Sequence, residues 1–219
     1  MNKIIIFGNG EIAQLANYYF ENDSDFEVVA FCVDKEYIKS DFFEDKPVVN
    51  YDNIENIYPP ENFKMFIALS YAKMNTIRQE KYFSAKSKGY RLVSYISSRC
   101  NYLSKFEPGD NCFILEDNTI QPFVKIGSNI TLWSGNHIGH HSELQDHIFI
   151  SSHVVISGHC TIQSNTFLGV NSTIGHNVII SRGTLIGAGV IQTKTTEENG
   201  VYLPPKSTKI DKKSFEISL

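Results

Sequence analysis

The 219-residue chain has few of the features that mark several common protein classes, beginning with cysteine. Its four cysteines are scattered, and no two of them form a C-x-x-C pair. This spacing argues against a zinc ribbon and against a disulfide framework. We therefore expect plain buried thiols at Cys32, Cys100, Cys112 and Cys160.

Clustered positive charge is also missing. Lys and Arg total 20 against 24 Asp and Glu, which gives a formal net charge of −4. No basic run or basic–aromatic stripe occurs, so we expect neither nucleic acid nor an anionic membrane as a partner. The apolar run at residues 4–7 is far too short for a signal peptide or a transmembrane helix. These absences predict a cytoplasmic protein.

The second half of the chain has a repeat of six residues. From Ile114 to Ile186 every sixth residue is Ile or Leu, thirteen times in succession. A period of six fits neither a simple strand nor an α-helix and predicts a hexapeptide β-helix, a prism with three hexads per coil. We expect about four coils. The residue after each aliphatic is often small, which predicts a tight corner there, and the fourth residue after it is small or β-branched, which predicts a second inward position.

The first half alternates strand and helix patterns. A strand at residues 3–8 runs into Gly8-Asn9-Gly10, and a helical spacing of apolar residues follows. Further strands are expected at 27–33, 47–49, 63–69 and 90–96, and a long helix at 73–89 that ends on a glycine. This order predicts a small parallel Rossmann-like βαβ domain. The fold class is thus α/β plus all-β, with the first domain at residues 1–97 and the β-helix at 98–219.

The glycine turn is the first candidate binding site. It lacks the third glycine of the dinucleotide fingerprint, so we do not interpret it as an NAD site. Free N–H groups where a helix begins at the carboxyl edge of a parallel sheet can bind a diphosphate. Asp34, at the end of the second strand, can accept hydrogen bonds from a base or ribose. A turn with only a folding role is the alternative.

All seven histidines lie at or after residue 137. With eighteen residues per coil, His140 lies over Gly158, and Gly158 lies over His176. An imidazole beside a glycine N–H provides a base for a nucleophile and a donor for an oxyanion, the pair that acyl transfer requires. His147 and His153 share the hexad phase of His141 and His159 and are expected to face outward. An intersubunit zinc site needs three converging ligands, and we expect no metal.

Four segments carry a family resemblance: Ile5-Ile6-Phe7-Gly8-Asn9-Gly10, Val33-Asp34-Lys35, Asn75-Thr76-Ile77-Arg78 and Phe167-Leu168-Gly169-Val170-Asn171-Ser172. They resemble the nucleotide-sugar acetyltransferases of the sialic acid O-acetyltransferase family, and the resemblance covers nearly the whole chain. It implies a left-handed β-helix that assembles as a homotrimer and binds acetyl-CoA between subunits. It also implies that the N-terminal domain holds a nucleotide-linked sugar.

The resemblance implies roles for individual residues. His140 would be the general base, with His141 beside it and the Gly158 N–H as the oxyanion donor. Where some relatives follow the base with a glutamate this chain has His141, so Glu143 and Asp146 are alternative orienting groups. Where some relatives have a second histidine this chain has Phe149, so the resemblance implies no CoA contact at that position. The implied acetyl-CoA contacts are Gly158, Gly169, Val170, Gly187, Ala188 and Lys206. The implied nucleotide-sugar contacts are Gly8, Asn9, Gly10, Asp34, Lys35, Ser70, Asn75 and Arg78.

The implied activity is acetyl-CoA-dependent N-acetylation of an amino-deoxy sugar, of the 4-amino-4,6-dideoxy type, for surface glycan biosynthesis. Three alternatives stay open at this point. One is an O-acetyltransferase acting on a sugar hydroxyl with the same scaffold and base. Another is a zinc enzyme similar to γ-type carbonic anhydrase. The third is a non-catalytic sensor of a nucleotide sugar.

Overall fold

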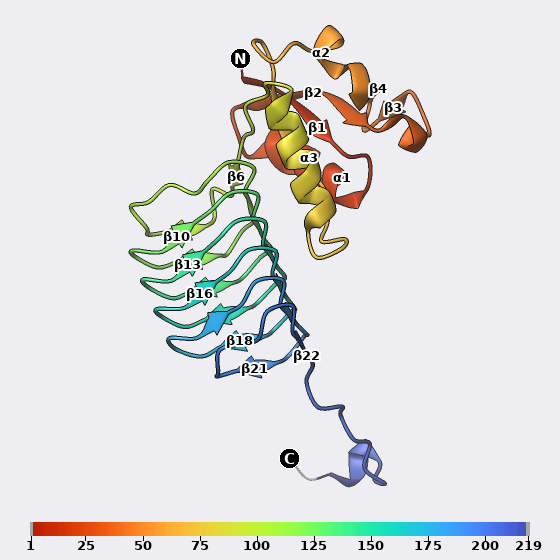
Figure 1. Cartoon of the computed structure of the whole chain (residues 1–219). Coiled ribbons are helices and arrows are strands. Elements are labelled where there is room, and N and C mark those ends of the chain that lie inside the picture. The colour runs from red at the N-terminus through yellow and green to blue at the C-terminus, as the bar shows by residue number, and fades with distance from the viewer. Residues whose placement is uncertain (1, 218–219) are drawn as a thin grey trace.

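A computed structural model describes residues 2–217 and shows a small α/β domain beside one end of a three-sided prism (Figure 1). The strands of the α/β domain are β1 (Asn2–Phe7), β2 (Phe26–Val33), β3 (Phe42–Phe43), β4 (Lys46–Asn50) and β5 (Lys64–Ile67). Its helices are α1 (Glu11–Asn22), α2 (Ile54–Ile57) and α3 (Thr76–Ser87), with short 3-10 turns at Lys35–Tyr37 and Tyr51–Asn53.

The sheet of the α/β domain has the order β3-β4-β2-β1-β5 and is parallel except for the edge strand β3. Its inner strand β1, between β2 and β5, is covered on both faces, which explains the run of fully buried residues Ile4, Ile5 and Ile6. Helix α1 packs on one face, where Phe20 lies in the same core as Ile4. Helix α3 packs on the other, where Tyr82 lies in the same core as Ile5. The predicted βαβ sheet is thus confirmed.

The strand expected at 90–96 does not complete this sheet. Only a single bridge, between Met65 and Leu92, joins that segment to β5. Three residues further on, β6 (Tyr95–Ile96) pairs with β8 (Phe113–Ile114) of the prism. The first coil of the prism therefore begins before the boundary expected at residue 97, because strand pairing passes from one domain to the other within a few residues.

The prism has three flat faces of short parallel strands. The domain face, on which the α/β domain packs, holds β6, β8 (Phe113–Ile114), β11 (Thr131–Leu132), β14 (Phe149–Ile150), β17 (Phe167–Leu168), β20 (Leu185–Ile186) and β22 (Val201–Tyr202). The second face holds β7 (Asn101–Tyr102), β9 (Thr119–Ile120), β12 (His137–Ile138), β15 (Val155–Ile156), β18 (Thr173–Ile174) and β21 (Ile191–Gln192). The third face holds β10 (Lys125–Ile126), β13 (Glu143–Leu144), β16 (Thr161–Ile162) and β19 (Ile179–Ile180).

The strand register confirms the hexapeptide β-helix, which is left-handed. Paired residues are one coil apart, as Leu132 and Ile150 are. The repeated aliphatics form one continuous core along the axis, and the predicted second inward residues, such as Val154 and Thr166, are fully buried. The prism is longer than four coils, because segments without the aliphatic repeat add strands at both ends: the domain face alone has seven.

The tight corner lies two residues later in each hexad than the sequence predicted. The backbone is left-handed at the third residue after the aliphatic, with φ near 60° at His141, His159 and Asn165, for example. Asn, Asp, Gly and His adopt this conformation at lower cost than most residues. The small residue directly after the aliphatic only precedes the corner. This requirement places His141, His147, His153 and His159 at corners.

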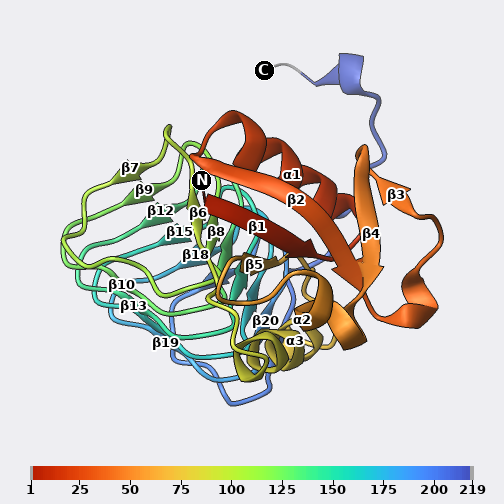
Figure 2. The ribbon, with the colours of Figure 1, turned by 90° about the horizontal axis from the view of Figure 1, so that it is seen from above.

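We name the three edges of the prism by what lies beside them. The α3 corner joins the third face to the domain face and includes residues 128–129, 146–147 and 164–165. The pocket corner joins the domain face to the second face and includes residues 152–153, 170–171 and 188–189. The far corner joins the second and third faces and includes residues 122–123, 140–141, 158–159 and 176–177. Seen from above, the far corner is the edge of the prism away from the α/β domain (Figure 2).

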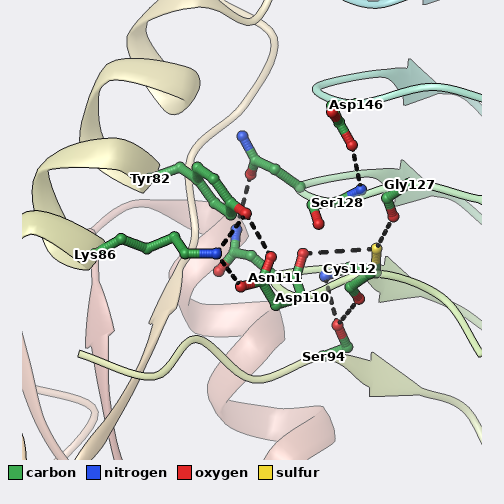
Figure 3. A network of polar contacts seen from close by, with 11 residues as sticks. Tyr82, Lys86, Ser94, Asp110, Asn111, Cys112, Gly127, Ser128 and Asp146 are labelled. Carbon is green, nitrogen blue, oxygen red and sulfur yellow. Dashed lines mark hydrogen bonds and ion pairs between the residues drawn. The ribbon is translucent and has the colours of Figure 1, made fainter. Parts of the chain in front are cut away.

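A polar network fastens α3 to the α3 corner (Figure 3). Asp110 accepts hydrogen bonds from the Tyr82 hydroxyl at 2.5 Å and from Lys86 Nζ at 2.7 Å. Asn111 accepts from the Ile67 N–H at the end of β5 and donates to the Asn129 side chain. The α/β domain is therefore held to the prism through directed hydrogen bonds as well as apolar contacts.

Candidate active site

A cavity of about 520 Å³ opens at the carboxyl edge of the α/β sheet. Five of the predicted nucleotide-sugar residues line it: Gly8, Asn9, Gly10, Asp34 and Ser70. The structure thus brings together residues from β1, β2 and the segment after β5. Lys35 is not among the lining residues; it begins the exposed 3-10 turn that follows Asp34.

The local backbone keeps this cavity open. Gly8 has φ = +128°, and a Cβ there would lie 2.7 Å from the Ala68 carbonyl oxygen, so a side chain is excluded. A Cβ at Gly10 would have no atom within 4 Å. Gly10 caps α1, whose first N–H groups have no partner inside the helix. They lie at the cavity and can donate to an anionic group such as a phosphate.

A cation of the cavity, Lys81, was missed from the sequence. Its Nζ lies 2.6 Å from Asp34 Oδ1 and about 5 Å from the ring centroids of Phe7 and Tyr51. The sequence signal for Lys81 was its spacing of one helical turn from Ile77. Such a spacing places both residues on the same side of α3, from which they line the cavity. Asp34 therefore lines the cavity as one half of an ion pair.

Asn75 and Arg78 do not line the cavity, which corrects the prediction that they contact the sugar nucleotide. Both are buried between α3 and the prism. Arg78 donates to Thr131 Oγ1 at 2.8 Å, to the Ile148 carbonyl at 2.9 Å and to Asn75 Oδ1 at 3.1 Å. Asn75 in turn donates to the Thr166 carbonyl. Asn75 and Arg78, whose short spacing resembled a binding motif, thus hold α3 against the prism.

The predicted base, His140, lies exposed on the far corner. Gln121 of the preceding coil accepts a hydrogen bond from the His140 N–H at 2.8 Å. The Nδ1 atoms of His140 and His141 are 3.1 Å apart, so one ring can donate to the other. His141, and neither of the proposed carboxylates, is the neighbour that can orient His140. Glu143 projects from the third face, and Asp146 accepts from the Ser128 N–H at the α3 corner.

The predicted stacking of His140 over Gly158 is confirmed: a Cβ at Gly158 would lie 2.9 Å from His140 Nε2. Between residues 2 and 217 no protein group accepts a hydrogen bond from the Gly158 N–H. At three other corner positions, the backbone N–H donates to a glutamine that lies nineteen residues earlier in the chain, namely Gln121, Gln145 and Gln163. For the Gly158 N–H, the residue that corresponds to these glutamines is Gly139, which has no side chain. The N–H beside the imidazole is therefore free to donate.

The predicted acetyl-CoA residues lie along the pocket corner and the chain beyond it. Val170 and Ala188 are exposed there, while Gly169 and Gly187 are buried in the turns before them. For the Ala188 N–H, the residue that corresponds to Gln121 is Gly169, which has no side chain. In the described part of the chain, the Ala188 N–H therefore also has no protein acceptor. A hollow of about 290 Å³ joins Val170 to Ser70 of the α/β domain. Lys206 is exposed on the tail after β22.

His147 does not face outward, as expected from its hexad phase, but is buried at the α3 corner, with 4% of its surface exposed. It packs edge-on against the rings of Tyr82 and Phe83 of α3. Asn129 Nδ2 lies 2.9 Å from His147 Nδ1 and donates to it. Burial lowers the pKa of His147 to about 4. The α/β domain covers this corner, which the repeat alone cannot indicate.

The cavity and the His140–Gly158 pair of one chain lie on opposite sides of the prism (Figure 2). The cavity belongs to the α/β domain on the domain face, whereas His140 and Gly158 are on the corner that this face does not touch. The packed core of the prism therefore lies between the cavity and the imidazole of the same chain. Val170 and Ala188, at the pocket corner, are one face away from His140.

Comparison with known proteins supports the fold. No family model matches the sequence, and no curated protein matches it. Among solved structures, the acetyltransferase domain of PglB from Neisseria gonorrhoeae FA1090 is similar with a TM-score of 0.77 and 19% identity, over 90% of this chain and 94% of that chain. PerB from Caulobacter crescentus, in complex with CoA and GDP-perosamine, has a TM-score of 0.75 and 19% identity, over 90% and 92%.

WeeI from Acinetobacter baumannii AYE is a further structural relative, with a TM-score of 0.56 and 18% identity, over 86% of this chain and 95% of that chain. At identities this low, the structural similarity shows a shared fold. This chain therefore has the architecture of these proteins, a small sheet domain followed by a left-handed β-helix, along almost its entire length. Within residues 2–217, no helix is long and apolar enough to cross a membrane.

Proposed function

We propose that this protein is an acetyl-CoA-dependent N-acetyltransferase acting on the amine of a nucleotide-linked amino sugar. The observation that carries the proposal is the exposed His140 imidazole beside the free Gly158 N–H. A base next to a rigid N–H donor is the arrangement that acyl transfer requires. The shared fold adds support, because PerB was solved with CoA and GDP-perosamine.

His140 acts as the base in this proposal. The neutral amine of the sugar attacks the carbonyl carbon of the thioester, and His140 accepts the proton that the nitrogen loses. The negative charge that develops on the carbonyl oxygen accepts a hydrogen bond from the Gly158 N–H. When the tetrahedral intermediate collapses, the C–S bond breaks and CoA leaves as a thiol after protonation by His140. The amide and free CoA are the products.

The cavity in the α/β domain is the proposed site for the nucleotide sugar. N–H groups at the start of α1 would bind the diphosphate. Asp34 and Lys81 provide an acceptor and a cation for the rest of the nucleotide. We propose a 4-amino-4,6-dideoxy sugar as the acceptor, and surface glycan biosynthesis as the pathway. The identity of the nucleobase, like the expected cytoplasmic location, stays a prediction.

The opposite positions of cavity and imidazole support a site shared between subunits. In a cyclic homotrimer, the cavity and pocket corner of one protomer can face the far corner of the next. Acetyl-CoA would then lie between Val170 and Ala188 of one protomer and His140 of its partner. We propose that the protein assembles in this way, and that the monomer lacks a complete site.

Thiol release from acetyl-CoA tests the function. The wild-type protein is assayed with UDP-, dTDP- and GDP-linked 4-amino-4,6-dideoxy sugars, beside His140→Ala and the control Glu61→Gln. Glu61 is exposed in the segment before β5, at the edge of the sheet opposite the cavity. We expect release with one amino sugar, a loss of about 10²–10⁴-fold in His140→Ala, and no change in the control.

Two other results would change the assignment. Release with a hydroxyl sugar only would replace the N-acetyltransferase by an O-acetyltransferase. No release with any acceptor would rule out the proposal and leave a sensor of nucleotide sugars.

A further inference from the structure

Three imidazoles converge at the far corner. The ligand nitrogens of His140, His141 and His159 all lie within 4.8 Å of one another, and the three side chains are exposed. His141 and His159 are stacked one coil apart with their rings nearly parallel, and the His140 ring stands edge-on to both. No ion pair between residues 2 and 217 involves any of them. The acyl-transfer proposal uses only one of these rings as its base.

The prism fixes the backbone beneath these rings. His141 and His159 both occupy left-handed corners, with φ near 60°. The His159 N–H donates to the His140 carbonyl at 2.9 Å, and Gln121 holds the His140 N–H. Because the three Cα atoms are already held in place, binding a shared ligand would cost only side-chain entropy.

The distances suit a tetrahedral metal ion. Zinc–nitrogen bonds of about 2.0–2.1 Å place two ligand nitrogens roughly 3.4 Å apart. The Nδ1 atoms of His140 and His141 are 3.1 Å apart. His159 can close the remaining gap by side-chain rotation, which its exposure permits. Three histidines leave a fourth position for water, and imidazole donors select zinc, copper, nickel or cobalt over magnesium and calcium.

We propose that the far corner is a binding site for a divalent ion of the zinc class, held by His140, His141 and His159, and that its occupancy inhibits the enzyme. A neutral imidazole has one nitrogen lone pair available to a metal or to a proton, while its other nitrogen carries hydrogen. An ion on His140 therefore removes the acceptor for the proton of the amine. The inhibition depends on the proposed acetyltransferase function, whereas the binding does not.

Direct metal binding is the first test. The full-length protein, stripped with a chelator, is titrated with ZnCl₂ by calorimetry, with MgCl₂ as a negative control. The variant His159→Asn removes one ligand but keeps a residue type that occupies this kind of corner at Asn165 and Asn177. His153→Asn is its matched control at the pocket corner. We expect one zinc per chain, at least about tenfold weaker binding in His159→Asn and no change in His153→Asn.

A tetrahedral site would also give cobalt(II) an intense visible absorption, which His159→Asn should reduce. Equal zinc affinity in all three proteins would overturn the site, as would no measurable binding to the wild type.

Inhibition is measured separately, by thiol release with and without ZnCl₂. We expect zinc to inhibit the wild type, a chelator to restore the rate, and His159→Asn to need at least about tenfold more zinc for half inhibition. Zinc that binds the three histidines without slowing an active enzyme would overturn the inhibitory role. If zinc binds as expected but no acceptor releases thiol, the acetyltransferase proposal fails and the metal site stands.

Discussion

Single residues at the corners decide what each coil can do. The left-handed backbone favours Asn, Asp, His and Gly, which occupy the corners from 111 to 189 except at Phe123. The same corner conformation thus gives an exposed cluster at His140, His141 and His159 and a buried structural residue at His147. The neighbour outside the prism, not the hexad phase, separates these roles.

Gly139 gives a prediction at the residue scale. A Cβ at Gly139 would lie 2.5 Å from the carbonyl carbon of Ser157 and 2.6 Å from the nitrogen of Gly158, so Gly139→Ala must displace the proposed oxyanion donor. We expect kcat to fall by about 10²-fold or more, because one rigid donor is lost. The rate of thiol release measures this effect.

Gly175→Ala is the control for Gly139→Ala. Gly175 follows the repeated aliphatic of its hexad, as Gly139 does, and lies two coils further along the same edge of the prism. A Cβ at Gly175 would meet its nearest neighbour only at 3.3 Å. Thermal denaturation of both variants distinguishes a lost donor from a lost fold. Equal rates in the two variants would contradict the role given to the Gly158 N–H.

At the scale of elements, helix α3 joins the two domains. Its residues contact a column of corner side chains: His147, which accepts a hydrogen bond from Asn129, packs against Tyr82, and Asn165 donates to Gln79 Oε1 at 2.7 Å. Arg78 adds a fully buried cation that is bound by neutral groups only. Placement of the cavity relative to the prism therefore depends on α3.

His147 makes this junction sensitive to acid. Its pKa is about 4 in the folded protein against 6.5 for an ordinary histidine, because burial lowers it; Asp146 and Asp110 oppose the shift, and Arg78 and Arg182 add to it. Between pH 6.5 and pH 4, His147 is protonated in the unfolded chain but not in the folded protein. The stability that the neutral, buried His147 contributes is therefore complete above pH 6.5 and is lost as the pH falls toward 4.

Between pH 7 and pH 5 we expect the free energy of unfolding to fall by about 2 kcal/mol through His147 alone. The variant His147→Asn suits the left-handed corner and does not titrate. Urea denaturation at both pH values should show a smaller loss in the variant by that amount. Identical losses in the two proteins would contradict the assignment.

At the scale of the whole molecule, the proposed site needs two chains. His140→Ala removes the base, and Gly10→Trp fills the cavity, where a side chain at Gly10 meets open space. Each variant alone should be inactive. Trimers formed from an equal mixture should regain about a quarter of the wild-type activity, because that fraction of sites combines an intact cavity with an intact histidine from the next chain.

Coexpression with two affinity tags, followed by the thiol-release assay, measures this recovery. A site made within one chain would recover nothing. Sedimentation of the wild-type protein checks the trimer itself, and a monomer at micromolar concentration would exclude the shared site.

The sequence by itself determined the N-terminal βαβ sheet, the β-helix and the stacking of His140 over Gly158. Those features depend on periodic patterns and on a fixed coil length, so local spacing is enough to predict them. The glycine turn was equally predictable, since its position after a buried strand defines the edge of the sheet.

Only the tertiary structure decided which residues face the cavity and which face the junction. Asn75 and Arg78 looked like binding residues but are buried against the prism, while Lys81, three residues further along α3, lines the cavity. His147 and His159 have the same hexad phase and opposite environments. The physical reason is that burial of a helix or corner depends on the element packed against it, and that contact joins segments far apart in the sequence.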